Sequence, residues 1–327
     1  MTTALPDAGP APAIAAVVIG RNEGARLVAC LASMPASVAR VVYVDSGSTD
    51  GSCAAARAAG AEVVELDLAR PFTAARARNA GVAALRAPGD RCAFVQFVDG
   101  DCMLAPGWVD RAAGFLARTP RAAVACGRRR ERFPEASVYN RLADLEWDRP
   151  PGPTESCGGD AMMRLDAFDA VGGFDPGLIA GEEPDLCARL HAAGWEIWRL
   201  DAEMTLHDAA MTRFGQWWRR SRRAGHAAAE GAERHPRGSD PRRVLRALGW
   251  GLLLPGGALA GALATPWALL ALPAQVVRLA LRAGAGRRLS WEWAVFTMLG
   301  KLPEALGIAE YHLRRRLRRR ARLIEYK

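Results

Sequence analysis

The sequence predicts an α/β fold, in which a mostly parallel sheet carries helices on both faces and a helical region follows it. Short apolar runs rich in β-branched residues alternate with helical segments over the first hundred residues, which is typical of parallel sheets. Polar residues and glycines follow these runs directly. Near the C-terminus, 30 consecutive residues at 248–277 carry no charge, so we expect a separate helical region there.

The apolar runs and the helical periods give the expected order of elements. Strands are predicted at 14–19, 41–44, 62–66 and 93–98, with helices at 27–34, 53–59 and 74–86 between them. Further along we expect a regular element at 161–171, a turn at 172–176, a helix at 182–193 and a strand at 196–200. The polar stretch 127–157 contains four prolines and is predicted to be a partly ordered loop or short helices over a site. Ligands of such sheets bind at the carboxyl ends of the strands.

Charge is distributed unevenly along the 327 residues. The segment 241–327 holds 16 basic and 4 acidic residues, which leaves 28 basic and 31 acidic residues before it. A mildly acidic domain with a basic tail argues against nucleic-acid binding and favours contact of the tail with an anionic membrane surface. The seven cysteines are an odd number, no two of them closer than ten residues. This spacing argues against a zinc site and favours a reduced, cytosolic compartment.

We expect three parts: a flexible leader at 1–12, a catalytic domain at 13–235, and a membrane-attached region at 242–327. The leader lacks the charged start of a signal peptide, because no Lys or Arg precedes Arg21. The uncharged stretch is too short for two full spans and has arginines on both sides. It predicts a hairpin that dips into the cytoplasmic face of a membrane and bends near Pro266, followed by an amphipathic helix at 291–317 and arginine runs at 314–316 and 318–320. The alternatives are a transmembrane segment or a buried helical hairpin of a soluble protein for the apolar stretch, and a solvated tail for the arginine run.

Acidic residues after the fourth strand form a candidate metal site. Asp99 and Asp101 flank Gly100 directly after an apolar run. Two carboxylates in this position can hold Mg²⁺ or Mn²⁺ together with the phosphates of a substrate. His207 follows a strand and is a candidate third ligand, although a tripeptide of this kind can also be a simple turn and a single histidine can be structural.

A second acidic group opens the helix predicted at 182–193. Glu182, Glu183 and Asp185 lie at the positive end of the helix dipole. A carboxylate kept ionised there can act as a general base, and helix capping is the alternative role. Trp217 and Trp218 can form an apolar wall for a sugar or a lipid, or serve as packing or membrane-interface aromatics. Motifs of dinucleotide dehydrogenases, P-loop NTPases, serine hydrolases and zincins are absent from the sequence.

Together these motifs resemble those of the family 2 glycosyltransferases with the GT-A fold, over roughly residues 13–230. In order along the chain they are Val17-Val18-Ile19-Gly20-Arg21-Asn22-Glu23, Val44-Asp45-Ser46-Gly47-Ser48-Thr49-Asp50-Gly51, Ala77-Arg78-Asn79-Ala80-Gly81, Asp99-Gly100-Asp101, Gly172-Gly173-Phe174-Asp175 and Gly181-Glu182-Glu183. The resemblance implies transfer of a sugar from a nucleotide diphosphate donor to a hydroxyl acceptor, with inversion at the anomeric carbon.

The resemblance also implies roles for individual residues. Residues expected to contact the nucleotide sugar are Arg21, Asn22, Glu23, Asp45, Arg76, Arg78, Asn79 and Asp99. Asp99, Asp101 and His207 would approach the metal, and Glu183 would deprotonate the acceptor. Residues expected near the acceptor are Glu182, Asp160, Trp217 and Trp218. A lipid-linked sugar is the acceptor we expect, because the tail would hold the site near a bilayer.

Three departures from the family pattern stand out. The chain has Asp45-Ser46 where a paired Asp is common, Glu182-Glu183 in place of Glu-Asp, and Gly158-Gly159-Asp160 in place of Gly-Asn. The segment 216–220 is only loosely similar to the signature of processive members, so a non-processive enzyme is expected. The alternatives are a non-catalytic protein of the same fold that binds sugar nucleotides, and a nucleotidyltransferase.

Overall fold

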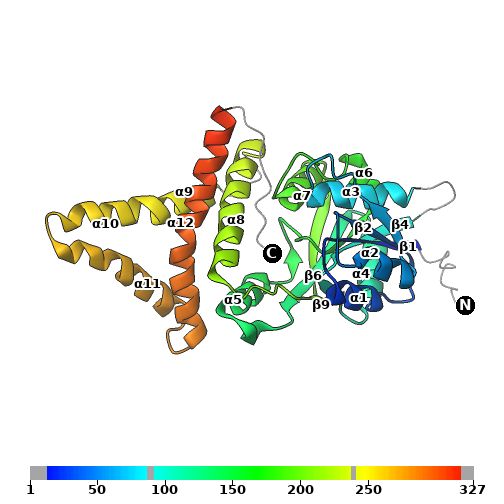
Figure 1. Cartoon of the computed structure of the whole chain (residues 1–327), viewed down its shortest axis with the longest axis horizontal. Helices are drawn as coiled ribbons and strands as arrows, with labels where there is room; N and C mark the ends of the chain where they lie inside the picture. Colours follow the sequence, from blue (N-terminus) through cyan, green and yellow to red (C-terminus); the bar gives the residue numbers. More distant parts are fainter. Residues whose placement is uncertain (1–12, 87–91, 237–240, 318–327) are drawn as a thin grey trace, which may run out of the picture.

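The computed structural model describes residues 13–86, 92–236 and 241–317, so the predicted leader at 1–12 and the arginines at 318–320 lie outside the described residues. Strands and helices alternate over the first hundred residues as the sequence predicted (Figure 1). The first elements are β1 (Ala13–Gly20), α1 (Ala25–Ala32), β2 (Val38–Asp45), α2 (Ser52–Ala58), β3 (Glu62–Glu65), α3 (Ala74–Ala84) and β4 (Cys92–Asp99).

The second half of the domain is more regular than the sequence suggested. It contains β5 (Cys102–Leu104), α4 (Trp108–Arg118), β6 (Ala122–Glu131), α5 (Val138–Trp147), β7 (Gly152–Pro153), β8 (Ala161–Arg164), α6 (Leu165–Ala170), α7 (Glu182–Ala192) and β9 (Glu196–His207). The prediction of a partly ordered loop or short helices at 127–157 is wrong at its start, where β6 continues to Glu131, whereas the ten-residue helix α5 agrees with it. The strand predicted at 196–200 extends to His207, since it pairs along its whole length with β6.

The sheet is parallel in its first half and mixed in its second. Its strand order is β3-β2-β1-β4-β8-β6-β9-β5, with β7 paired to β9. The first four strands are parallel, whereas β8 runs antiparallel to both β4 and β6. Register aligns Gly20 with Asp45 and Ile19 with Asp99. The turns after β1, β2 and β4 therefore meet at one edge of the sheet, where parallel sheets bind ligands.

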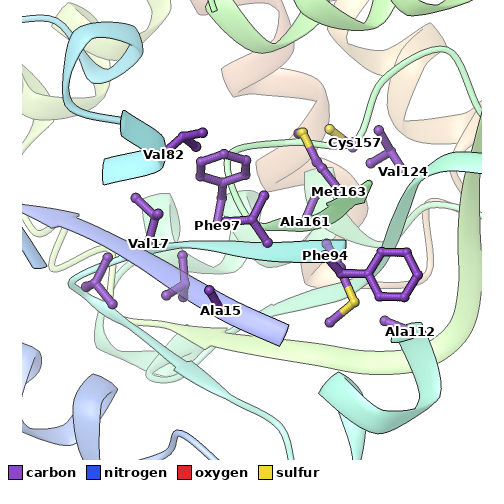
Figure 2. Close-up of a cluster of buried hydrophobic side chains, with 14 of the residues drawn as sticks. Ala15, Val17, Val82, Phe94, Phe97, Ala112, Val124, Cys157, Ala161 and Met163 are labelled. Carbon is purple, nitrogen blue, oxygen red and sulfur yellow. The ribbon is translucent and has the colours of Figure 1, made fainter. Parts of the chain in front are cut away.

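Helices pack closely on the sheet through small side chains. Val17 and Phe97 are fully buried, and Figure 2 shows them among the apolar residues of the core together with Val82 of α3. A Cβ added at Gly81 would lie 2.4 Å from Val17 Cγ1, so only glycine allows α3 to approach β1 this closely. This packing fixes the direction of α3 and hence the side chains that α3 presents to the edge of the sheet.

A helical region follows the sheet domain. It consists of α8 (Phe214–Arg234), α9 (Pro241–Leu248), a π-helical turn (Gly249–Leu253), α10 (Leu254–Ala262), a 3-10 helix (Pro266–Leu270), α11 (Ala271–Arg282) and α12 (Arg288–Arg316). The long helix α12 lies along α8, and the α10–α11 hairpin projects away from the sheet domain (Figure 1). The chain reverses beside Pro266, where the sequence analysis expected the bend.

The α10–α11 hairpin leaves large apolar side chains exposed. Leu263 is 93% exposed and Trp267 is 75% exposed. Among the described residues one helix, Arg242–Ala262, is long and apolar enough by length and composition to cross a membrane, and only 17% of its most apolar window is buried against the rest of the chain. The hairpin is thus an apolar surface that no other described part of the chain covers.

Candidate active site

A cavity of about 1780 Å³ opens at the carboxyl edge of the sheet, between this edge and the helices α7 and α8. Nine residues singled out from the sequence line it: Arg21, Asn22, Glu23, Arg78, Asp99, Asp101, Glu182, Glu183 and Asp185. They come from four separate segments of the chain. The fold therefore brings most of the predicted donor-binding, metal-binding and basic residues to a single hollow.

Arg78 ties two of the acidic segments together inside this cavity. Its guanidinium is 3% exposed and donates to Asp99 Oδ1 at 2.8 Å and to Glu182 Oε1 at 2.9 Å. Burial opposes the charged form, but the carboxylates of Asp99 and Glu182 outweigh it and hold the pKa of Arg78 above its ordinary value. The arginine therefore stays charged and fixes the start of α7 relative to the end of β4.

The turns after β1 and β2 support each other. The Asn22 N–H donates to Ser48 Oγ at 2.8 Å, and Asn22 Oδ1 accepts from the Thr49 N–H at 2.7 Å. Asn22 has φ 55°, a left-handed conformation that asparagine tolerates better than most residues. These bonds fix the backbone that the sequence analysis assigned to the nucleoside.

Asp45 stabilises its own turn. Its carboxylate accepts the N–H groups of Gly47 and Ser48, each at 2.8 Å, and the Tyr43 hydroxyl at 2.9 Å. Burial would raise the pKa of Asp45, but the hydrogen bonds from Ser48, Tyr43 and Gly47 lower it below its ordinary value. Asp45 does not line the cavity among the described residues, so its predicted contact with the base remains a prediction.

Asp101 and His207 are neighbours, as the sequence analysis required of metal ligands. The pairing of β5 with β9 aligns Cys102 with His207, and His207 Nε2 lies 3.4 Å from Asp101 Oδ2. Glu131 Oε2 lies 3.6 Å from Nδ1 on the other side of the ring. Carboxylate oxygens next to an imidazole nitrogen fit a divalent cation such as Mn²⁺. His207 is the last residue of β9 rather than a residue after the strand.

Asp160 stabilises the Asp99-Gly100-Asp101 turn through hydrogen bonds beneath the surface. It is fully buried and accepts the Asp99 N–H at 3.0 Å, the Thr205 hydroxyl at 2.9 Å and the Arg129 guanidinium at 2.6 Å. Asp160 does not line the cavity within the described residues, so its position does not support the predicted acceptor contact. The sequence analysis did not single out Arg129, which lines the cavity. Its only signal in the sequence is the run Arg128-Arg129-Arg130, which gives no indication of which arginine points inward.

Glu183 projects into the cavity from the first turn of α7. The helix begins after Gly181, whose φ of 80° favours glycine. Glu183 Oε1 accepts the Cys157 N–H at 2.6 Å, and Cys187 Sγ lies 3.5 Å from the same oxygen. The helix dipole stabilises the ionised carboxylate in this position. The side chain is thus oriented by its neighbours and reaches the cavity, which a general base requires.

His207 and four further predicted residues do not line the cavity among the described residues. The Arg76 guanidinium donates to the backbone carbonyls of Asp67, Arg70 and Pro71. Asn79 bonds both the N–H and the carbonyl of Phe174. Trp217 stacks with Tyr139 and meets Phe296 edge-on, and Trp218 packs against the same cluster. These contacts favour structural roles, and the ligand contacts predicted for the four residues stay predictions without support from their positions.

The far wall of the cavity is basic and comes from helices that the sequence analysis did not connect with the site. Arg220 and Arg223 of α8 and Arg243 of α9 line it, and Arg220 pairs with Glu146 at 2.8 Å. These arginines follow the last strand of the sheet in the sequence, and the docking of α8 and α9 brings them to the cavity. The cavity therefore extends from the acidic turn of β4 to the foot of the apolar hairpin.

Comparison with known proteins agrees with this architecture. One relative of the chain is the succinoglycan biosynthesis protein ExoA of Rhizobium meliloti. The two are 28% identical over 193 residues, which cover 55% of this chain and 58% of that protein. A pre-mycofactocin glycosyltransferase of Mycobacterium tuberculosis is 29% identical over 307 residues, with 87% of this chain and 59% of that protein covered. The chain thus spans less than two thirds of the length of these relatives.

A solved structure shows the same fold over nearly the whole chain. The mannosyltransferase PcManGT from Pyrobaculum calidifontis, in complex with GDP-Man and Mn²⁺, superposes with a TM-score of 0.59 at 20% identity, covering 94% of this chain and 90% of that one. Residues 16–169 match the family model described as glycosyl transferase family 2. This segment contains β1 to β4 with the acidic turn, so the part of the chain that carries Asp99 and Asp101 is similar to glycosyl transferase family 2.

Proposed function

We propose that the chain is an inverting, non-processive glycosyltransferase that moves a sugar from a nucleotide diphosphate donor to a hydroxyl group. The observation that carries this proposal is the convergence of Asp99, Asp101 and Glu183 on one cavity of about 1780 Å³. The match of residues 16–169 to the model of glycosyl transferase family 2 and the glycosyltransferase activity named for the mycobacterial relative support the same class of reaction.

The donor diphosphate would lie near the acidic turn of β4. Asp101 and His207 have the chemistry to hold a divalent cation, Mn²⁺ or Mg²⁺, with Asp99 next to it. When bound, such a cation neutralises the negative charge that develops on the leaving diphosphate. Arg129 adds a fixed positive charge to the same wall of the cavity, while Asp160 holds both Arg129 and the Asp99 backbone in place.

Glu183 would act as the general base. Its Oε1 is engaged by the Cys157 N–H, so we assign the proton transfer to Oε2. The acceptor oxygen gives its proton to this carboxylate and forms a bond to the anomeric carbon. On the opposite face, the bond from that carbon to the diphosphate oxygen breaks and its electron pair leaves with the nucleoside diphosphate. Attack from the face opposite the leaving group inverts the anomeric centre.

The acceptor is proposed to be carried by a lipid. The cavity extends from Glu183 to Arg220, Arg223 and Arg243, and Arg243 belongs to the helix that leads into the exposed apolar hairpin. Arginines suit a phosphate group next to the lipid chain, and the exposed leucines suit insertion into one leaflet. We therefore propose attachment to the cytoplasmic face of a membrane, where nucleotide sugars are available.

Release of nucleoside diphosphate from a panel of nucleotide sugars tests the proposal. Detergent-purified full chain is supplied with a lipid extract and with Mn²⁺, Mg²⁺ or EDTA. We expect release from one donor that EDTA abolishes and that Asp101→Ala lowers at least 100-fold, which is about 2.7 kcal/mol. Asp166→Ala, a change at an exposed acidic residue, is the matched control. The proposal fails if no donor binds in the presence of metal and no diphosphate is released.

A further inference from the structure

Two cysteines and the proposed general base form a cluster that the mechanism does not use. Cys157 precedes the Gly158-Gly159-Asp160 turn, and Cys187 lies on α7, 30 residues later. Their Sγ atoms are 3.7 Å apart, and Cys187 Sγ is 3.5 Å from Glu183 Oε1. The three ligand atoms all lie within 4.8 Å of one another. The spacing along the sequence, which argued against a zinc site, conceals this arrangement.

The distances match the edges of a tetrahedral metal site. Zinc binds thiolate sulfur at about 2.3 Å and carboxylate oxygen at about 2.0–2.2 Å. At tetrahedral angles these bonds separate two sulfurs by about 3.8 Å, and a sulfur from an oxygen by about 3.5–3.7 Å. The observed separations of 3.7 Å and 3.5 Å agree with both values. The side chains could therefore accept a tetrahedral cation with little movement.

The surroundings also suit a metal site. Cys157 and Cys187 are 3% and 0% exposed, whereas Glu183 lines the cavity. A cation would enter from the cavity and keep one open position facing it. The Cys157 N–H already orients the Glu183 carboxylate at 2.6 Å, as supporting hydrogen bonds do for carboxylate ligands. The hydrogen bond with the neighbouring Cys187 thiol and burial raise the pKa of Cys157, so this cysteine stays protonated without a cation.

We propose that Cys157, Cys187 and Glu183 form a binding site for a thiophilic divalent cation of the Zn²⁺ class. Binding displaces the two thiol protons into solvent and forms two metal–thiolate bonds and one metal–carboxylate bond. This site differs in chemistry from the one at Asp101 and His207, because two sulfurs select soft cations over Mg²⁺ and Mn²⁺. A cation bound to Glu183 Oε1 draws electron density from the carboxylate, lowers the basicity of Oε2 and so inhibits the enzyme, a consequence that rests on the proposed function.

Titration of the full chain with Co²⁺ as a spectroscopic substitute for Zn²⁺ tests the binding itself. We expect one equivalent to give a thiolate-to-cobalt charge-transfer band with the visible absorption of tetrahedral Co²⁺, and one equivalent of Zn²⁺ to remove both. Cys157→Ser and Cys187→Ser should each lower the affinity at least 100-fold. Cys30→Ser, which alters an equally buried cysteine outside the cluster, should leave it unchanged.

The Co²⁺ spectrum of the wild-type chain tests for metal binding by thiolates even if a serine variant fails to fold. Absence of a thiolate band in the reduced wild-type chain overturns the proposal, and so does an unchanged band in both serine variants. Formation of a Cys157–Cys187 disulfide in place of metal uptake, detected by mass spectrometry, also overturns it. A positive Co²⁺ spectrum in a chain without transferase turnover leaves the metal site standing and refutes the proposed function. Turnover that persists at saturating Zn²⁺ refutes the inhibition alone.

Discussion

The sheet and the C-terminal hairpin are both built from apolar residues, yet their side chains meet different surroundings. Val17 and Phe97 in the sheet are fully buried, whereas Leu259 and Leu263 in the hairpin are 65% and 93% exposed. Burying a leucine is worth about 1.5–3 kcal/mol relative to leaving it in water. Among the described residues nothing gives the hairpin this stabilisation, and we propose that a lipid leaflet covers it.

The arginines of the two regions differ in the same way. Arg78 in the sheet domain is buried between two carboxylates, and Arg129 is held by the buried Asp160. At the foot of the hairpin, Arg243 and Arg282 are exposed. Buried pairs position groups at fixed distances, whereas exposed arginines provide positive charge for an external partner. We propose that the first region holds a site and that the second binds a membrane surface.

Substitution of the buried Arg78 should lower the stability of the sheet domain more than any other change that we predict. Arg78→Met leaves Asp99 and Glu182 close together without their shared cation, so we expect a loss of about 3–5 kcal/mol in the free energy of unfolding. Arg76→Met, two residues away on the same helix, removes bonds to backbone carbonyls of a surface loop and should cost less. Denaturant midpoints measure both. Equal losses in the two variants would contradict the role assigned to Arg78.

Polar substitutions at the tip of the hairpin should separate membrane binding from folding. In Leu259→Asn together with Leu263→Asn we expect weaker binding to anionic vesicles, by about 1.5–3 kcal/mol for each leucine that inserts fully. The free energy of unfolding should change by no more than about 0.5 kcal/mol, because neither residue is buried. Leu68→Asn, at a 70% exposed leucine of the sheet domain, is the matched control. Co-sedimentation with vesicles is the measurement, and unchanged binding of the double variant would exclude insertion of the tip.

The contact between α8 and α12 holds the helical region together and depends on glycine. A Cβ at Gly225 would lie 2.0 Å from Glu304 O, whereas a Cβ at Gly231 of the same helix meets nothing within 4 Å. We expect Gly225→Ala to lower the unfolding free energy by about 1–3 kcal/mol through overpacking. Gly231→Ala should be neutral or stabilising by up to about 1 kcal/mol. Thermal unfolding compares the two, and a neutral Gly225→Ala would show that α12 can shift away without cost.

The same contact should weaken slightly in acid. His226 is buried against Tyr311, and burial lowers its pKa below 6.5, while Glu310 opposes the shift and Arg314 adds to it. The unfolded chain therefore binds this proton more readily than the folded one. The contribution of His226 is complete above about pH 6.5 and is lost as the pH falls through the lowered value. The denaturation midpoint of the His226→Gln variant should depend less on pH in this range than that of the wild type. The midpoint of the His312→Gln variant, in which an exposed histidine is changed, should depend on pH as the wild type does.

The sequence predicted the first half of the sheet well, because strands such as β1 and β4 are apolar runs bounded by polar turns. It also predicted that Asp101 and His207 lie together as metal ligands. It could not identify Arg129 among three consecutive arginines, nor the basic wall on α8, because these positions depend on how distant segments dock. The Cys157–Cys187 contact was hidden for the same reason. Trp217 was expected near the acceptor, yet its surroundings are set by the packing of α12, which no local pattern in the sequence reveals.

The central claim is that Glu183 performs proton transfer in the cavity. Its most direct test is Glu183→Gln, compared with the wild type for nucleoside diphosphate release and for donor binding by calorimetry, with Glu135→Gln at an 85% exposed side chain as control. We predict that release falls by about 10²–10⁴-fold while the donor affinity is retained. Release at the wild-type rate from the Glu183→Gln enzyme would contradict the account.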